Sequence, residues 1–273
     1  MRHVRYFSMF SGIGGFELGI EQAAQELGIT TECVGYSEID KAAIRTYEEH
    51  FNHDNYGDAT LINPDSLPEF DLLVGGFPCQ AFSIAGKRLG FDETRGTLFF
   101  DIARILEAKQ PRFLILENVK GLISHNKGQT FRTIIRTLDE LGYQLQWKVL
   151  NSKDHGVPQS RERVFIVGNL GGTRQPEVFS PGGPSNPYST VGLTTETAVA
   201  RTFTAGGNSG GNHSGMTIIR TPEGDRRATV VEAERLSGYT DNWTVGSDTQ
   251  RYKQCGNTVV PPVVRDVALR LLA

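Results

Sequence analysis

The first 27 residues carry the pattern that most restricts the possible fold. Val4 to Phe10 is a short, mostly apolar run that predicts a strand, and Phe16 to Leu27 has apolar residues at helical spacing. Between them, Ser11-Gly12-Ile13-Gly14-Gly15 predicts a tight turn. A strand, a glycine turn and a helix in this order bring backbone N–H groups and a helix N-terminus close to a ligand. Glycines also form turns that bind nothing, so the turn alone leaves both interpretations open.

Strand and helix patterns continue to alternate after this unit. Apolar or alternating runs predict strands over residues 34–37, 70–74, 111–116, 143–150 and 163–168, and a short strand end over 55–59. Helical spacing of apolar residues predicts helices over 42–51, 98–106, 131–141, 229–239 and 263–272, with a turn over 255–262. We therefore expect an α/β fold, Rossmann-like, with a mostly parallel sheet flanked by helices.

Composition limits the class of protein further. The 273 residues can bury a good core, as one α/β domain or as one domain plus a small insert. The formal charge of −3 means that a nucleic-acid-binding chain must concentrate its basic residues on one face. The three cysteines are widely spaced, without the paired spacing of a metal site or a disulfide framework. No signal peptide or membrane-length apolar run is present, so we expect a soluble, cytosolic protein without a metal.

A second glycine turn carries a potential nucleophile. The strand over residues 70–74 leads into Gly75-Gly76, and Pro78 fixes φ immediately before Cys79. A cysteine on a stiff turn at a strand end lies where a nucleophile belongs in an open α/β fold, and its thiolate would be the reactive form. Most lone cysteines are instead small buried hydrophobic residues, and the spacing alone does not exclude that alternative.

The sequence around this cysteine, Gly75-Gly76-Phe77-Pro78-Cys79-Gln80-Ala81-Phe82-Ser83, resembles the catalytic motif of DNA cytosine-5 methyltransferases of the bacterial and phage type. Further segments resemble other motifs of that family in the family's order, and they cover nearly all of the chain outside residues 169–227. They are the segments 10–16, 37–40, 57–58, 95–98, 117–119, 159–163, 232–236 and 256–259.

The resemblance implies a set of catalytic roles. Cys79 would add to carbon 6 of cytosine as the thiolate and so make carbon 5 nucleophilic. Glu117, at least partly protonated, would stabilise the charge that develops at ring nitrogen 3, and Asn118 would fix the loop that carries Glu117. Arg163 would contact the cytosine carbonyl oxygen, and Arg161 would bind phosphates or the loop of the site. Taken singly, a Glu-Asn pair also fits a helix cap, and an Arg-x-Arg pair also fits a solvated surface.

The resemblance also implies S-adenosylmethionine as the methyl donor. Glu38 would bind the ribose, Asp58 the adenine amino group, and Phe10 the adenine or sulfonium face. The full set of expected cofactor-binding residues is Phe10, Gly12, Ile13, Gly14, Gly15, Glu38, Ile39, Asp58, Ala59, Pro78, Leu98, Asn257 and Thr258. An acidic residue about 20 positions after a glycine turn suits ribose hydroxyls, whereas the nearby Asp40 fits a helix N-cap at least as well.

Double-stranded DNA is the partner that the resemblance implies, and the target cytosine must leave the base stack before Cys79 can reach it. The loop from Gln80 to Arg95 would then close over the site as a lid. The expected DNA-binding residues are Gln80, Ser83, Lys87, Arg88, Arg95, Gln159, Asn208, Asn212, His213 and Arg220. We expect a monomer that acts in a bacterial cell or a phage-infected host.

The chain departs from the family pattern between Arg163 and Glu232, where the interval is short for a target-recognition domain. Residues 169–227 are rich in Gly, Ser, Thr, Pro and Asn, which also fits a disordered linker. The strand-like run from Met216 to Ile219 favours a small, irregular, β-rich lobe instead. We expect a catalytic and cofactor-binding domain over residues 1–168 plus 255–273, and a small target-recognition domain over residues 169–254.

Three alternatives keep parts of this pattern. A transfer-RNA cytosine-5 methyltransferase of the same fold would carry a Cys-Phe-Thr segment in its later half, which this sequence lacks. An inactive DNA-binding homologue would have no need of an intact Cys79, Glu117 and Arg163. A dehydrogenase could use the first glycine turn but gives no role to Pro78-Cys79.

Overall fold

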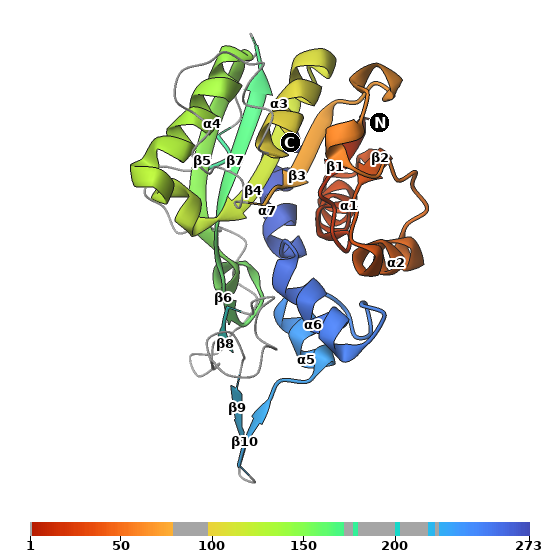
Figure 1. Cartoon of the computed structure of the whole chain (residues 1–273), viewed down its shortest axis with the longest axis vertical. Coiled ribbons are helices and arrows are strands. Elements are labelled where there is room, and N and C mark those ends of the chain that lie inside the picture. Colours follow the sequence, from red (N-terminus) through yellow and green to blue (C-terminus); the bar gives the residue numbers. More distant parts are fainter. Residues whose placement is uncertain (1, 79–97, 172–176, 180–199, 203–217, 222–223) are drawn as a thin grey trace.

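The computed structural model describes residues 2–78, 98–171, 177–179, 200–202, 218–221 and 224–273. Within these residues one six-stranded sheet has the order β2-β1-β3-β4-β7-β5 (Figure 1). Its strands are β1 His3–Met9, β2 Thr30–Ser37, β3 Leu72–Gly76, β4 Phe113–Val119, β5 Tyr143–Asn151 and β7 Glu162–Leu170. The strands β2, β1, β3 and β4 are parallel, whereas β7 is antiparallel to both of its neighbours. The expected Rossmann-like, mostly parallel sheet is confirmed.

The reversal of β7 follows from the connection that precedes it. Parallel neighbours need a crossover of a dozen or more residues, usually through an α-helix. Between Asn151 and Glu162 the chain forms only the 3₁₀ helix Ser152–His155 and the short strand β6, Gln159–Ser160. Such a connection returns the chain beside β5 in the opposite direction, and this puts the start of β7 next to the end of β4.

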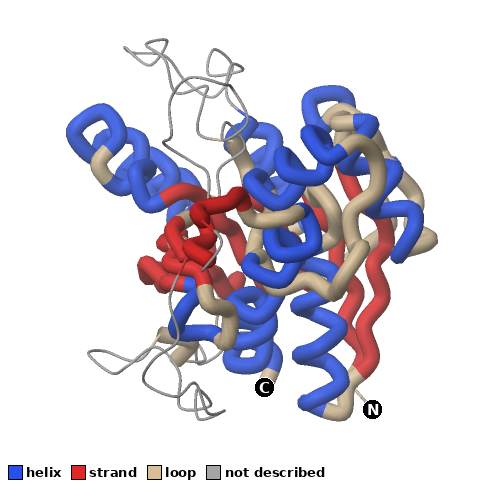
Figure 2. Tube along the Cα trace, turned by 90° about the horizontal axis from the view of Figure 1, so that it is seen from below, coloured by secondary structure: helices blue, strands red, loops and turns tan. Residues whose placement is uncertain are grey.

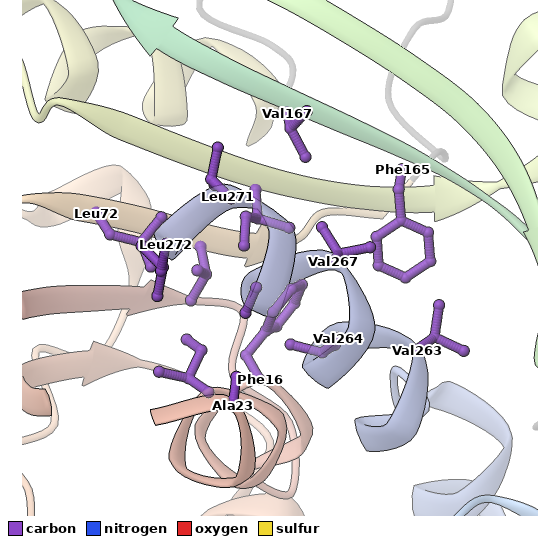
Figure 3. Close-up of a cluster of buried hydrophobic side chains, with 14 of the residues drawn as sticks. Phe16, Ala23, Leu72, Phe165, Val167, Val263, Val264, Val267, Leu271 and Leu272 are labelled. Atoms are coloured by element: carbon purple, nitrogen blue, oxygen red, sulfur yellow. The ribbon is translucent and has the colours of Figure 1, made fainter. Parts of the chain in front are cut away.

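Helices cover both faces of the sheet. On one face, α1 Gly15–Leu27 and α7 Pro261–Leu272 pack on the inward side chains of β1, β3 and β7 (Figure 3). On the other face, α3 Leu98–Lys109 and α4 Gln129–Glu140 pack on the side chains that point the opposite way, such as Phe7, Leu73 and Ile166. Successive side chains of the central strands point to opposite faces, and helices cover both faces. Most residues of β1, β3, β4 and β7 are therefore apolar.

The remaining elements lie below the sheet in the view of Figure 1. They are α5 Val230–Leu236, α6 Asp248–Asn257, and two small sheets, one of β6 with β8 Ala200–Arg201 and one of β9 Ile218–Thr221 with β10 Gly224–Arg227. The hydroxyl of Thr46, in α2 Lys41–His50, donates to Gln254 Oε1 of α6 at 2.8 Å, so these two helices are bound together. The division into two domains at residues 169–254 stays a prediction.

The two ends of the chain lie on the same side of the molecule (Figure 2). Arg2 Nη1 donates to the carbonyl oxygen of Leu272 at 2.7 Å, which ties the end of α7 to the start of β1. The final helix therefore packs back beside the first strand. Among the residues that the structure describes, none of the helices is both long enough and apolar enough to cross a membrane.

The predicted turn over residues 255–262 is wrong at both ends. Cys255, Gly256 and Asn257 form the last turn of α6, a helix that the sequence analysis did not predict, and α7 already begins at Pro261. The buried residues of α6 are Gln254, Cys255 and Gly256, so its inward face lacks the large apolar side chains on which the helical pattern depends. Proline is favoured in the first turn of a helix, and here it starts α7 rather than ending a turn.

Two further differences concern the expected site residues Asp58 and Glu117. The expected strand end over residues 55–59 is a single bridge between Tyr36 and Asn55, after which Asp58 caps the 3₁₀ helix Ala59–Leu61. The Oδ1 atom of Asp58 accepts from the backbone N–H of Thr60 at 2.9 Å, and this capping bond competes with a strand. Glu117, expected after a strand, lies within β4.

A carboxyl group is fully buried beneath the first glycine turn. Glu17, in the first turn of α1, is 0% exposed, and Tyr47 Oη donates to its Oε1 at 3.1 Å. Burial raises the pKa of Glu17 to about 7. The unfolded chain therefore loses this proton at lower pH than the folded chain, and stability falls as pH rises from about 4.5 to about 7.

We expect Glu17→Gln to remove this loss of stability. A shift of this size corresponds to roughly 3 kcal/mol between pH 4.5 and pH 8 in the wild type, and the amide carries no proton to lose. Urea unfolding at both pH values measures the difference, with Glu26→Gln on the exposed part of the same helix as the matched control. An equal pH dependence in wild type and Glu17→Gln would contradict the prediction.

Candidate active site

The exit of β3 lies directly beside Glu117. β3 and β4 pair in parallel, and Gly76 is opposite Glu117 in the register. A Cβ atom on Gly76 would come within 3.4 Å of Glu117 Oε2, so glycine leaves the carboxyl group room at this position. The chain continues through buried Phe77 to exposed Pro78. Cys79 lies outside the described residues, but the segment that leads to it leaves the sheet next to the carboxyl group of Glu117.

Glu117 and Arg163 form a nearly buried pair. Arg163 Nε lies 3.1 Å from Glu117 Oε1, and the two side chains are only 16% and 11% exposed. The antiparallel register brings them together, because Val119 at the end of β4 is opposite Arg163 near the start of β7. Burial raises the pKa of Glu117 above its usual value, although Arg163 and Arg161 oppose this shift. The carboxyl group therefore holds a proton more readily than an exposed glutamate does.

Asn118 fixes the exit of β3 rather than a loop around Glu117. Its Nδ2 atom donates to the carbonyl oxygen of Phe77 at 2.7 Å, in a buried position. Because Glu117 lies inside β4, no loop carries it, and the expected contact of Asn118 with such a loop is wrong. The hydrogen bond instead orients the peptide just before Pro78, two residues before Cys79.

Arg161 is buried and binds the C-terminal end of α6. Its side chain donates from Nη2 to the carbonyl oxygens of Gly256 at 3.0 Å and Thr258 at 2.6 Å, and the residue is only 2% exposed. Burial, together with the neighbouring cation of Arg163, lowers the pKa of Arg161 to about 9, so the guanidinium stays charged at neutral pH. The predicted role of Arg161 toward phosphates or the loop of the site stays a prediction.

A cavity of about 190 Å³ lies between the first glycine turn, the start of α2 and the end of α6. We call it the Gly12–Thr258 cavity. It brings together segments from both ends of the sequence, and five expected cofactor residues line it. The lining residues are Gly12, Ile13, Glu38, Asp40, Ala42, Ala43, Gln250, Lys253, Gln254, Asn257 and Thr258.

Glu38 organises the wall of this cavity. Its Oε2 accepts from the backbone N–H of Gly12 at 2.9 Å, while Oε1 accepts from those of Ile39 and Asp40 at 2.8 Å each. Gly12 has φ +59°, a conformation that glycine adopts without strain. Asp40 is the N-cap of α2, with Oδ1 accepting from Ala42 N at 2.9 Å, as its alternative interpretation predicted.

The other expected cofactor residues do not line the Gly12–Thr258 cavity as the described residues form it. Phe10 is half-buried with φ 55°, and Ile39 is 68% exposed. Ala59 is buried, with its carbonyl oxygen bound by Arg104. The others are Gly14 as the N-cap of α1, Gly15 as its first residue, Asp58 as a cap, exposed Pro78, and Leu98 at the start of α3. Their roles stay predictions.

Most expected DNA-binding residues lie outside the described residues: Gln80, Ser83, Lys87, Arg88, Arg95, Asn208, Asn212 and His213. The backbone of Arg220 belongs to β9. Gln159 is fully buried, and neither polar atom of its side-chain amide has a hydrogen-bond partner among the described residues. The DNA-binding roles therefore stay predictions.

The sequence analysis missed several residues beside the cavity. Gln250, Lys253 and Gln254 are spaced as one face of a helix, three and four residues apart. The signal for that helix was present, because Ser247 and Gln250 form a capping box at its start. Lys253 Nζ lies 2.8 Å from Asp40 Oδ2, which joins α6 to the cap of α2 at the cavity.

Comparisons with known proteins agree with this arrangement. The family model for C-5 cytosine-specific DNA methylase matches residues 4–191 and 177–273. The Type II methyltransferase M1.ScrFI of Lactococcus lactis subsp. cremoris is 37% identical over 307 residues, which cover 98% of this chain and 78% of that protein. The Type II methyltransferase M.NlaIV of Neisseria lactamica is 48% identical over 178 residues, or 62% of this chain and 42% of that protein.

A solved structure supports the fold. The Dnmt2 methyltransferase of S. pombe has a TM-score of 0.77 with 18% identity, covering 98% of both chains. At this identity the likeness concerns the fold alone. The family match over nearly the whole sequence, with the 37% identity to M1.ScrFI, shows that the chain belongs to the family of C-5 cytosine-specific DNA methylases.

Proposed function

We propose that the chain transfers a methyl group from S-adenosylmethionine to carbon 5 of a flipped-out cytosine in double-stranded DNA, through a covalent bond between Cys79 and carbon 6. The observation that carries the proposal is the pairing of the β3 exit with Glu117. It brings the exit of β3, three residues before Cys79 in the sequence, beside a carboxyl group whose pKa is raised by burial. The proposal includes a monomer as the active form, in the cytoplasm of a bacterial cell or a phage-infected host.

The chemistry requires that a nucleophile and a general acid act on the same cytosine ring. The thiolate of Cys79 forms a bond to carbon 6, and the electrons of the ring double bond make carbon 5 nucleophilic. Protonated Glu117 donates to ring nitrogen 3, where negative charge would otherwise collect. After carbon 5 has taken the methyl group, loss of its proton to water or hydroxide restores the double bond and expels the thiolate, and the proton on ring nitrogen 3 returns to the Glu117 carboxylate.

The two arginines have different tasks in this mechanism. Arg163, which lies 3.1 Å from Glu117, keeps the carboxyl group oriented and would contact the cytosine carbonyl oxygen. Arg161 binds the carbonyl oxygens of Gly256 and Thr258, so it positions the cavity wall rather than touching the base. Asn118 orients the peptide that precedes Pro78.

The Gly12–Thr258 cavity suits S-adenosylmethionine, which supplies the methyl group when bound. Its wall combines the carboxylates of Glu38 and Asp40, the ammonium group of Lys253 and the amide of Asn257. These donors and acceptors match the hydroxyl, carboxylate and ammonium groups of that molecule. The family match supports the same donor, because its members are methylases.

Incubation of the chain with tritiated S-adenosylmethionine tests the proposed function. Duplex DNA should become labelled, and bisulfite sequencing should place the label at carbon 5 of cytosine. Preferential labelling of transfer RNA would favour the RNA methyltransferase alternative. Binding of DNA without any label would favour an inactive homologue.

We expect Glu38→Ala to weaken S-adenosylmethionine binding about ten- to a hundredfold, the size of a lost charge-assisted hydrogen bond. The effect on the rate at saturating donor should be smaller, because Glu38 lies away from Glu117 and Arg163. Calorimetric titration measures the affinity, with Glu32→Ala, an exposed acid on β2, the strand that precedes Glu38, as the control. An unchanged affinity would mean that Glu38 serves only as a cap for backbone N–H groups.

A further inference from the structure

The loop after α5 reaches both walls of the Gly12–Thr258 cavity. Tyr239 Oη makes a short hydrogen bond with Thr258 Oγ1 and also donates toward the carbonyl oxygen of Val259 at 3.3 Å. Trp243 Nε1 donates to the carbonyl oxygen of Ile13 at 3.0 Å. We propose that Tyr239 and Trp243 are positioning residues that hold the two walls of this cavity at the separation that the methyl donor requires. The inference rests on the proposed function of the cavity.

Tyr239 contacts residues of the cavity walls but does not itself line the cavity. The residue is buried, and burial raises the pKa of its phenol, so the hydroxyl keeps its proton and can donate. A Cβ atom on Gly15 would lie only 2.5 Å from Tyr239 Oη and 2.7 Å from the carbonyl oxygen of Val259. Glycine at the start of α1 therefore lets the hydroxyl approach the first glycine turn and the Thr258 loop at once.

Trp243 is itself fixed by α2. Its indole ring stacks on the ring of His50 with centroids 3.6 Å apart, and His50 Nε2 donates to the carbonyl oxygen of Trp243 at 2.8 Å. The rings of Trp243 and Tyr239 also pack together, with centroids 5.2 Å apart. The two side chains form one cluster with Ile13, so movement of the loop would displace the carbonyl group of Ile13.

Thr258 is held from two independent sides. Arg161 binds its carbonyl oxygen, whereas Tyr239 binds its side chain. Loss of the tyrosine hydroxyl therefore leaves the carbonyl oxygen of Thr258 bound to Arg161. We expect a graded loss of donor affinity rather than its abolition.

The test compares Tyr239→Phe with Tyr143→Phe. Tyr143 is a matched control, since it is buried too and its hydroxyl donates to the carbonyl oxygen of Pro111 at 2.8 Å. It lies on β5, at the edge of the sheet opposite β2. Both variants should lower Tm to a similar extent, but only Tyr239→Phe should weaken S-adenosylmethionine binding, by about three- to tenfold for one neutral hydrogen bond. Calorimetry measures the affinity without requiring turnover.

A double-mutant cycle with Thr258→Val tests the specific contact. Thr258→Val should weaken donor binding less in the Tyr239→Phe background than in the wild type, because the shared hydrogen bond is already lost. Trp243→Phe, which removes the bond to Ile13, should also raise the donor Kd and the donor KM while changing kcat less.

Equal donor affinities in wild type and Tyr239→Phe, with a lowered Tm, would reduce Tyr239 to a packing residue and overturn the inference. Additive effects in the double-mutant cycle would overturn it as well. The titration of the wild type separates this result from failure of the proposed function. A wild type that did not bind S-adenosylmethionine would refute both the function and the inference.

Discussion

We expect Cys79→Ala to abolish DNA methylation and to leave S-adenosylmethionine binding nearly unchanged, which is the largest effect that we expect from a single substitution. Without the thiolate, carbon 5 of cytosine is too electron-poor to accept a methyl group at a useful rate. Loss of covalent catalysis should therefore lower the rate by more than about a thousandfold. Transfer of tritium from the donor to duplex DNA measures this rate, and calorimetry measures donor binding.

Cys33→Ala is the matched control for this variant. Burial raises the pKa of the Cys33 thiol to about 12, so it stays protonated and cannot serve as the nucleophile. DNA that contains 5-fluorocytosine should trap wild type and Cys33→Ala as covalent complexes, because fluorine cannot leave as a proton does. The Cys79→Ala variant should form none. Residual turnover above about a thousandth of wild type would exclude Cys79 as the nucleophile.

Glu117→Gln has the second largest expected effect, a rate about a hundred- to a thousandfold lower, within the usual range for general acid catalysis. The amide keeps the shape of the side chain but cannot transfer a proton to ring nitrogen 3. In the wild type, burial raises the pKa of Glu117, so its protonated fraction falls as pH rises through that pKa, and the rate falls with it. The variant should lack this decline, which a pH profile of single-turnover rates would show.

Glu162→Gln is a suitable control for the loss of a negative charge near Arg163. Glu162 is exposed and pairs with Lys120 at 2.9 Å, so its carboxylate makes an ordinary surface ion pair. We expect a rate close to that of the wild type. Retention of the wild-type pH profile in Glu117→Gln would assign the essential acid to another group.

The sequence predicted most of the sheet because β1, β3, β4 and β7 are mostly apolar and the residues of β5 alternate, whereas β2 begins at Thr30, before its predicted start at residue 34. The glycine turn before α1 followed from the same pattern, whereas Glu117, predicted to follow a strand, lies within β4. The predictions failed where local signals were weak or competed. α6 buries Gln254, Cys255 and Gly256, which carry no apolar stripe, and Asp58 caps a 3₁₀ helix where a strand end was expected.

Contacts between distant segments could not be predicted in the same way. The bonds from Tyr239 to Thr258 and from Trp243 to Ile13 join parts of the chain that no periodicity relates. Arg161 could equally have faced solvent, since an Arg-x-Arg pair on a strand is compatible with an exposed surface. Its burial against Gly256 and Thr258 depends on where α6 and α7 pack, and this is a property of the tertiary fold.

The reversed strand β7 determines where the chain can change in length. Arg163 lies near the start of β7, opposite Val119 at the end of β4. Asn169 lies near the end of β7, opposite Phe113 at the start of β4, so it is at the other end of this strand pair. An insertion before Glu162 would shift Arg163 relative to Glu117. Residues added after Leu170 would follow the end of β7 that lies away from Glu117. They would leave the register between Arg163 and β4 unchanged. Segments of very different size could therefore be exchanged at this junction between relatives, while the catalytic edge of the sheet stays the same.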